Sequence, residues 1–204
     1  MSAPNRPARL CVMISGGGRT LINLLDRIER GALNAEMPLV IASRRCPGVE
    51  RASARGLRTI IMPGEIAAPA LETTLAEARI DWVALGGYLQ LIRIPERYRW
   101  RIVNIHPALL PSFGGPGMYG MRVHRAVIDA GCRISGCTVH LCDERFDHGP
   151  ILAQRACEVK LDDTPEALAH RVFDLECALY PETLARLFGS RLSVESGRAR
   201  LVEP

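Results

Sequence analysis

The chain has 204 residues, 48% of them hydrophobic, which is enough for one buried core and too little for two ordinary domains. Its formal charge of +4 comes from dispersed arginines, so it suits a small anionic substrate and argues against nucleic acid as a partner. No apolar run is long enough to span a membrane, and residues 1–9 lack the apolar core of a signal peptide. We therefore expect a single domain over residues 1–204, in a cytoplasmic protein without membrane contact.

Over the first half of the chain, apolar runs rich in β-branched residues alternate with segments of helical periodicity. This alternation predicts a Rossmann-like α/β fold, with an open, mostly parallel, twisted sheet and helices on both faces. The expected strands are residues 10–14, 39–42, 59–62, 82–85 and 102–105, and the expected helices are residues 20–30, 49–55 and 69–79.

The pattern changes after residue 105, because residues 113–120 read FGGPGMYG, which no helix or central strand tolerates. We expect this loop to be a flap over an active site. Thr164 and Pro165 have the residue types of an N-cap and a first helical turn, and they predict a long C-terminal helix. His124 and His170 are expected on helix surfaces. The remaining expected elements are a helix at 123–130, strands at 136–142 and 151–159, and a small hairpin after Gly189.

The seven cysteines are an odd number and include no C-x-x-C pair, which is typical of reduced residues in a core. Cys132, Cys137 and Cys142 recur every five residues, and that is not the spacing of a zinc site. We therefore expect no metal centre among the cysteines.

A glycine-rich segment, Ser15-Gly16-Gly17-Gly18-Arg19-Thr20, joins the first expected strand to the first expected helix. Free backbone amides and the positive end of a helix favour a phosphate at such a junction. The segment lacks the ending of a Walker loop, and Leu21 stands where a dinucleotide fingerprint has its third glycine. A monophosphate fits best, although a tight turn that needs positive φ would use the same glycines.

Two arginines, Arg44 and Arg45, follow the second expected strand, where they could meet the 2′-phosphate of NADP. An NADP reductase therefore stays an alternative. A solvated loop explains the same pair, and we favour that interpretation.

Asn104-Ile105-His106-Pro107 ends the fifth expected strand. Side chains alternate along a strand, so Asn104 and His106 are expected on one face, at the carboxyl end where parallel sheets bind ligands. An amide beside an imidazole can hold an oxyanion and supply a proton to it. A hydrogen-bonded core histidine is the competing interpretation of the pattern taken alone.

An acidic turn at residues 143–150 offers a carboxylate that could orient His106 and raise its basicity. Such turns are also often simply solvated. A hydrolytic metal site made of His140, Asp143, Asp147 and His148 is a further alternative, but the spacing is neither helical nor that of a standard motif. We therefore expect no metal here, and His140 is expected to be structural.

The ordered segments ISGGGRT, NIHPALLPSFGG, GCTVH and DERFDHGPILAQ resemble the folate-dependent formyltransferases of the glycinamide ribonucleotide transformylase type, which act in purine biosynthesis. The resemblance runs over a core at about residues 9–188 and leaves a short tail at 189–204. It implies attack of the glycinamide ribonucleotide amine on the formyl carbon of 10-formyltetrahydrofolate, which is a consumed cosubstrate. It implies no metal and a monomer or homodimer acting on small molecules.

The resemblance also implies roles for individual residues. Asn104, His106 and Asp147 match the catalytic group. The implied phosphate site is Gly16, Gly17, Gly18, Arg19 and Thr20, the implied ribonucleotide contact is Glu176, and the implied folate site is Tyr88, Leu89, Leu91, Ile92, Leu141, Cys142 and Asp143.

The chain departs from the family pattern at Gly17 and Arg44, where many members have Asn, and at Gln90, where some have Arg. These changes bear on substrate preference. A 10-formyltetrahydrofolate deformylase, with water in place of the amine, and a diverged paralogue that only binds a ligand remain the alternatives. Methionyl-tRNA formyltransferase shares the catalytic domain but carries a further C-terminal domain, which we do not expect in this protein.

Overall fold

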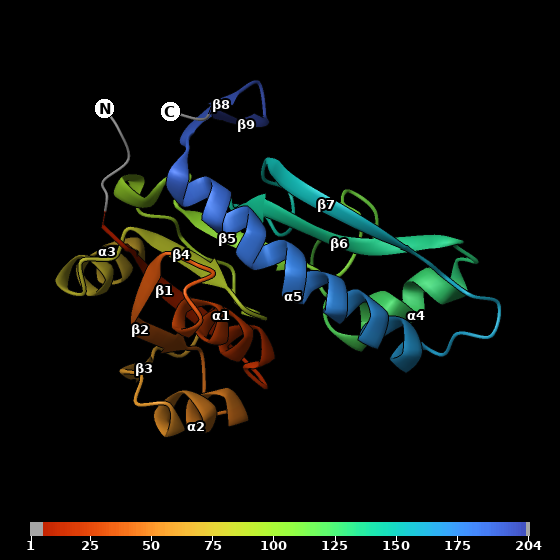
Figure 1. Ribbon diagram of the computed structural model, residues 1–204, viewed down its shortest axis with the longest axis horizontal. Helices are drawn as coiled ribbons and strands as arrows, with labels where there is room; N and C mark the ends of the chain where they lie inside the picture. The colour runs from red at the N-terminus through yellow and green to blue at the C-terminus, as the bar shows by residue number, and fades with distance from the viewer. Residues whose placement is uncertain (1–5, 203–204) are drawn as a thin grey trace.

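The computed structural model describes residues 6–202, so the expectation for residues 1–9 lies partly outside the described chain. A seven-stranded sheet forms its centre, in the order β3-β2-β1-β4-β5-β6-β7 (Figure 1). The first five strands in this order pair in parallel, and β6 and β7 join antiparallel at one edge. The strands are β1 (Ala8–Ile14), β2 (Ala35–Ala42), β3 (Thr59–Ile61), β4 (Trp82–Leu85), β5 (Ile102–His106), β6 (Ile134–Leu141) and β7 (Ile151–Glu158).

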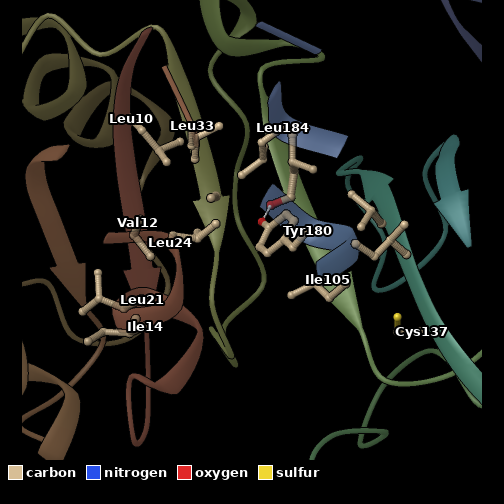
Figure 2. Packing of buried hydrophobic residues seen from close by; sticks show 14 of the residues in the cluster. Leu10, Val12, Ile14, Leu21, Leu24, Leu33, Ile105, Cys137, Tyr180 and Leu184 are labelled. Atoms are coloured by element: carbon tan, nitrogen blue, oxygen red, sulfur yellow. Dashed lines mark hydrogen bonds between the residues drawn. The ribbon is translucent and has the colours of Figure 1, made fainter. Parts of the chain in front are cut away.

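Helices cover both faces of the sheet, as the sequence predicts. Side chains alternate along β1, so Leu10, Val12 and Ile14 contribute to a core that contains α1 and α5 side chains (Figure 2). Cys11 and Met13 pack into a second core with side chains of α3. The helices are α1 (Arg19–Glu29), α2 (Pro47–Ala54), α3 (Ala68–Glu77), η1 (Glu96–Tyr98), α4 (Met121–Asp129) and α5 (Pro165–Gly189).

The long helix α5 packs across the sheet and contacts both β5 and the antiparallel strands β6 and β7. The Thr164 side chain caps it by accepting a hydrogen bond from the amide of Ala167 at 3.2 Å, which confirms the predicted start. The fully buried Tyr180 hydroxyl donates to the carbonyl of Val103 at 2.8 Å, on β5. The helix is thereby held directly against the strand that carries Asn104 and His106.

Two sequence expectations need correction. The second strand begins at Ala35, not at residue 39, because the β1–β2 register shifts between Arg9 and Cys11 and so accommodates Pro38 within the strand. His124 is not on a helix surface: its side chain is 5% exposed on the inner side of α4. His170 is exposed, as expected.

The predicted C-terminal hairpin is present as β8 (Arg191–Glu195) and β9 (Arg198–Val202). Its apolar side chains pack against the main core, namely Leu192, Val194, Ala199 and Leu201. Among the helices of residues 6–202, none combines the length and the apolar character that a membrane crossing requires.

Candidate active site

A cleft of about 450 Å³ opens at the carboxyl ends of β1, β4 and β5, which is where an open parallel sheet binds its ligands. The Gly16–Thr20 segment and Glu176 lie in one part of its wall. Asn104, His106 and Asp147 also line the cleft. The glycine-rich loop after β5, which is the expected flap, forms another part of its wall. The sequence-predicted catalytic and phosphate-loop residues therefore share one cavity.

The carboxylate of Asp147 connects the three expected catalytic side chains. Its Oδ1 accepts a hydrogen bond from Nδ2 of Asn104 at 3.3 Å and lies 3.3 Å from Nδ1 of His106. Nε2 of His106 lies 2.8 Å from the carbonyl oxygen of Phe113. Both ring nitrogens of His106 thus face oxygen acceptors, so a protonated ring can donate at both positions.

His140 is part of this network, although the sequence indicates only a structural role. It pairs directly with Asn104 across β5 and β6. Its Nδ1 lies 2.9 Å from the carbonyl of Leu141, which can only accept, so Nδ1 carries the proton. In the neutral ring Nε2 is then an acceptor, and it lies 3.0 Å from Nδ2 of Asn104. His140 therefore fixes the orientation of the Asn104 amide.

Asp147 is ionised in this environment. Burial opposes the charged form, but hydrogen bonds from His106 and from the amide of Gly115 outweigh it and hold the pKa of Asp147 well below its usual range. The backbone of Asp147 is left-handed, with φ of 54°, which is unusual for a residue with a side chain. A Cβ at Gly114 would lie 3.1 Å from that of Asp147, so the glycine lets the flap approach the carboxylate.

The glycine loop after β1 has the form of an anion site. Gly18 adopts left-handed φ of 72° and precedes the first turn of α1, whose N-terminal amides have no partner within the helix. The guanidinium of Arg19 lies 4.0 Å above the ring of Phe173 at the edge of the cleft. Burial raises the pKa of Glu176, opposite this loop on α5, to about 8, although the charge of Arg19 opposes the shift.

Comparison with known proteins shows the family of the chain. The formyl transferase family model matches residues 8–184, which include the whole seven-stranded sheet and most of α5. The chain belongs to the formyl transferase family. It is 36% identical to a chloroplastic phosphoribosylglycinamide formyltransferase of Arabidopsis thaliana, over 97% of this chain and 71% of the relative. It spans 63 to 71% of the length of three such plant relatives.

Solved formyl transferase structures have the same fold. A crystal structure of glycinamide ribonucleotide transformylase 1 from Symbiobacterium toebii superposes with a TM-score of 0.87, at 33% identity and over 98% of this chain and 96% of that one. A formyltetrahydrofolate deformylase from Pseudomonas syringae gives 0.84, at 22% identity, over 98% of this chain and 67% of the other. At that identity the second likeness shows the fold alone.

The expected folate residues fall into two groups. Tyr88 and Leu89 line the cleft, and burial raises the pKa of the Tyr88 hydroxyl to about 12, which keeps it neutral. The other five residues lie outside the cleft wall. Ile92 is buried in the core under α3, and burial raises the pKa of the Cys142 thiol. This second group is Leu91, Ile92, Leu141, Cys142 and Asp143.

Several cleft residues carry no motif that sequence reasoning could use. His124 lies in the wall, where its buried Nδ1 has no hydrogen-bond partner within residues 6–202. Burial, together with the charge of His106, lowers the pKa of His124 to about 4. The flap is different, because its glycine-rich composition predicted a place at the active site. The other unassigned wall residues include Phe146, Ala169, Val172 and Phe173.

The alternative metal site finds no support in the described chain. Across residues 6–202, no three His, Cys, Asp or Glu side chains gather in a way that could hold a metal ion. Of the residues that the alternative required, His148 lies outside the cleft and contacts Asp143 at 2.6 Å, while His140 contacts Asn104.

Proposed function

We propose that the protein transfers the formyl group of 10-formyltetrahydrofolate to the amine of glycinamide ribonucleotide. One observation carries this proposal: an Asn104–His106–Asp147 network and a loop of backbone amide donors line the same cleft. The network suits acyl transfer, and the loop suits the phosphate of the amine substrate. The named transformylase relatives support the transferase over a deformylase.

In this mechanism the amine nitrogen attacks the formyl carbon, and a carbon–nitrogen bond forms while the carbonyl oxygen becomes an oxyanion. The protonated His106 ring donates a hydrogen bond to that oxygen, and the Asn104 amide donates another once its contact to Asp147 is exchanged. Asp147, held ionised, stabilises the imidazolium. The bond between the formyl carbon and the folate nitrogen then breaks, and the proton released by the amine reaches that nitrogen through water.

The flap is coupled to this chemistry through His106. Nε2 of His106 already meets the carbonyl of Phe113, and Nδ1 meets Asp147. The ring can therefore donate to an oxyanion only when one of these contacts is exchanged. Because Asp147 stabilises the imidazolium, we infer that the Phe113 contact is the one released as the substrates bind.

The two substrates are assigned to different parts of the cleft. The phosphate takes the Gly16–Thr20 amides, and Glu176 meets the ribonucleotide beside them. The pterin lies against Tyr88 and Leu89, which form an apolar wall. Contacts to the second group of expected folate residues, Leu91, Ile92, Leu141, Cys142 and Asp143, stay a prediction.

We further infer a cytoplasmic enzyme that works as a monomer or homodimer on small molecules, without a metal. All seven cysteines are free thiols, as is usual in a reducing compartment.

The test is an assay of 10-formyltetrahydrofolate with and without glycinamide ribonucleotide, following both folate release and incorporation of labelled formyl. We expect folate release only when the amine is present. Equal release without it would establish a deformylase, and no release in either case would establish a ligand-binding paralogue. Calorimetry should detect no saturable micromolar binding of NADPH, and such binding would revive the reductase.

A further inference from the structure

The back of the glycine loop is held by the segment that contains α2. Nε of Arg44 donates to the carbonyl of Ser15 at 2.9 Å, and Nη1 of Arg51 donates to the carbonyl of Gly17 at 2.9 Å. Between them, the backbone amide of Gly48 donates to the carbonyl of Gly16 at 3.0 Å. Three consecutive carbonyls thus bond to donors from one neighbouring segment.

This arrangement fixes the direction of the loop amides. In a trans peptide the carbonyl of one residue and the N–H of the next point in opposite directions, and these peptide bonds are trans. The N–H groups of Gly16, Gly17 and Gly18 therefore point away from the α2 segment. Within residues 6–202, none of the three donates to another backbone group. The loop presents them as a cluster of free donors.

Close contact between two glycines sets the spacing. A Cβ on Gly18 would lie 2.7 Å from Cα of Gly48, and a Cβ on Gly48 would lie 2.7 Å from the carbonyl oxygen of Gly16. The two backbones therefore touch without any side chain between them. This approach brings the amide of Gly48 within hydrogen-bond distance of the Gly16 carbonyl.

The arginines also bring charge that other groups do not cancel. Arg55, the residue that follows α2, forms salt bridges to Asp26 and Glu29. The ion pairs of residues 6–202 include neither Arg44 nor Arg51. Two guanidinium groups with no carboxylate partner thus lie directly behind the loop that faces the ligand.

We propose that Arg44 and Arg51 are positioning residues for the substrate phosphate, which orient the Gly16–Gly18 amides and add positive potential behind them. The inference rests on the proposed function in that it names the phosphate of the same cleft. It also gives a role to Arg44, one of the positions where this chain departs from its family. On this view the solvated-loop interpretation of Arg44 is incomplete, because its side chain is exposed yet bound to the loop.

The test compares Arg51→Met, Arg44→Met and Arg51→Lys with Arg55→Met as the matched control. Arg55 immediately follows α2 but binds Asp26 and Glu29 instead of the loop. Each variant is assayed with glycinamide ribonucleotide and with the same molecule lacking the phosphate. Loss of one charge-assisted contact should raise the KM for the ribonucleotide about tenfold, with kcat and the folate KM little changed.

The effect should depend on the phosphate. We expect Arg51→Met and Arg44→Met to leave kcat/KM for the unphosphorylated amine unchanged, Arg51→Lys to recover part of the loss, and Arg55→Met to behave as the wild type. Equal losses with both amines would reveal a purely structural role and overturn the inference. An unaltered ribonucleotide KM in folded Arg51→Met would do the same.

Binding of ribose 5-phosphate, measured by calorimetry, separates this inference from the proposed reaction. The measurement needs no formyl transfer. If the protein is catalytically inert but binds ribose 5-phosphate about tenfold more weakly in Arg51→Met, the proposed function fails and the inference stands. If transfer occurs and Arg51→Met binds ribose 5-phosphate as well as the wild type does, the inference fails alone.

Discussion

The two ends of the cleft are built from different parts of the chain and from different kinds of group. At the phosphate end, the donors are backbone amides, and glycines Gly18 and Gly48 bring their segments together. At the reaction end, the groups are the side chains of Asn104, His106 and Asp147, joined by hydrogen bonds. The backbone amides are fixed dipoles and bind a phosphate, whose charge is always present. The titratable side chains instead stabilise charge that develops during the reaction. We therefore expect substitutions at the two ends to separate binding from rate.

The largest effects should arise at the reaction end. His106→Ala and Asp147→Asn should each lower kcat by at least about a hundredfold, because each removes stabilisation of charge that appears only in the transition state. The KM for either substrate should change much less. Steady-state kinetics with both substrates varied measure this, and His170→Ala, an exposed histidine on α5, is the control. Near-normal kcat in either variant would refute the mechanism.

At the phosphate end, Gly18→Ala should raise the ribonucleotide KM about tenfold and leave the folate KM unchanged. The new Cβ would meet Cα of Gly48 at 2.7 Å and push the loop away from its support. Gly31→Ala is the matched control, since Gly31 has nearly the same φ, 71°, but open space around it. Both variants bear similar backbone strain. The phosphate assignment is therefore supported only if the ribonucleotide KM rises in Gly18→Ala and not in Gly31→Ala.

Much of this frame is visible in the sequence. The continuous apolar runs of β1 and β4, the glycines at the start of α1, and the Thr164 cap are local patterns, and local patterns predict elements. The parallel order then brings the ends of β1 and β5 to one edge, so the phosphate loop and Asn104 with His106 could be placed together. The family resemblance added Asp147, which lies on a turn with no regular period.

The contacts that connect distant segments could not be predicted. Arg44 and Arg51 bond to carbonyls 29 and 34 residues away, and no periodicity encodes such a contact. The burial of His124 is hidden for the same reason, because an imidazole at a helix start is compatible with either surface or cleft. The role of His140 depends on the exact register of β5 against β6, which pairs it with Asn104.

A smaller effect should come from Glu176, which lines the same cleft. Its pKa is raised from 4.5 to about 8 in the folded chain because burial penalises the carboxylate. The unfolded chain releases this proton first as pH rises, so the group lowers the free energy of unfolding progressively between about pH 4.5 and pH 8. Glu176→Gln should remove this loss.

Urea titrations at pH 5 and pH 8 measure the difference. Glu176→Gln should gain stability relative to the wild type at pH 8 and little at pH 5. Glu77→Gln, at an exposed position on α3, should show no such pH-dependent gain. If the free energy of unfolding depends on pH in the same way in Glu176→Gln and in the wild type, the Glu176 carboxyl is ionised in the folded protein. The ribonucleotide contact would then carry a negative charge.

The smallest expected change is the one that tells most about the reaction end. Asp147 reaches the substrates chiefly through His106, whose Nδ1 lies 3.3 Å from Oδ1 of the carboxylate. If Asp147 acts by holding the imidazolium, it has nothing to hold once the ring is gone. The double variant His106→Ala/Asp147→Asn should then be no more than about twofold slower than His106→Ala alone, although each single change costs about a hundredfold. Asp147 also accepts from Asn104 at 3.3 Å, so a second route to the oxyanion exists. Fully additive losses in kcat, measured under saturating substrates, would show that the carboxylate works through Asn104 or directly on the migrating proton.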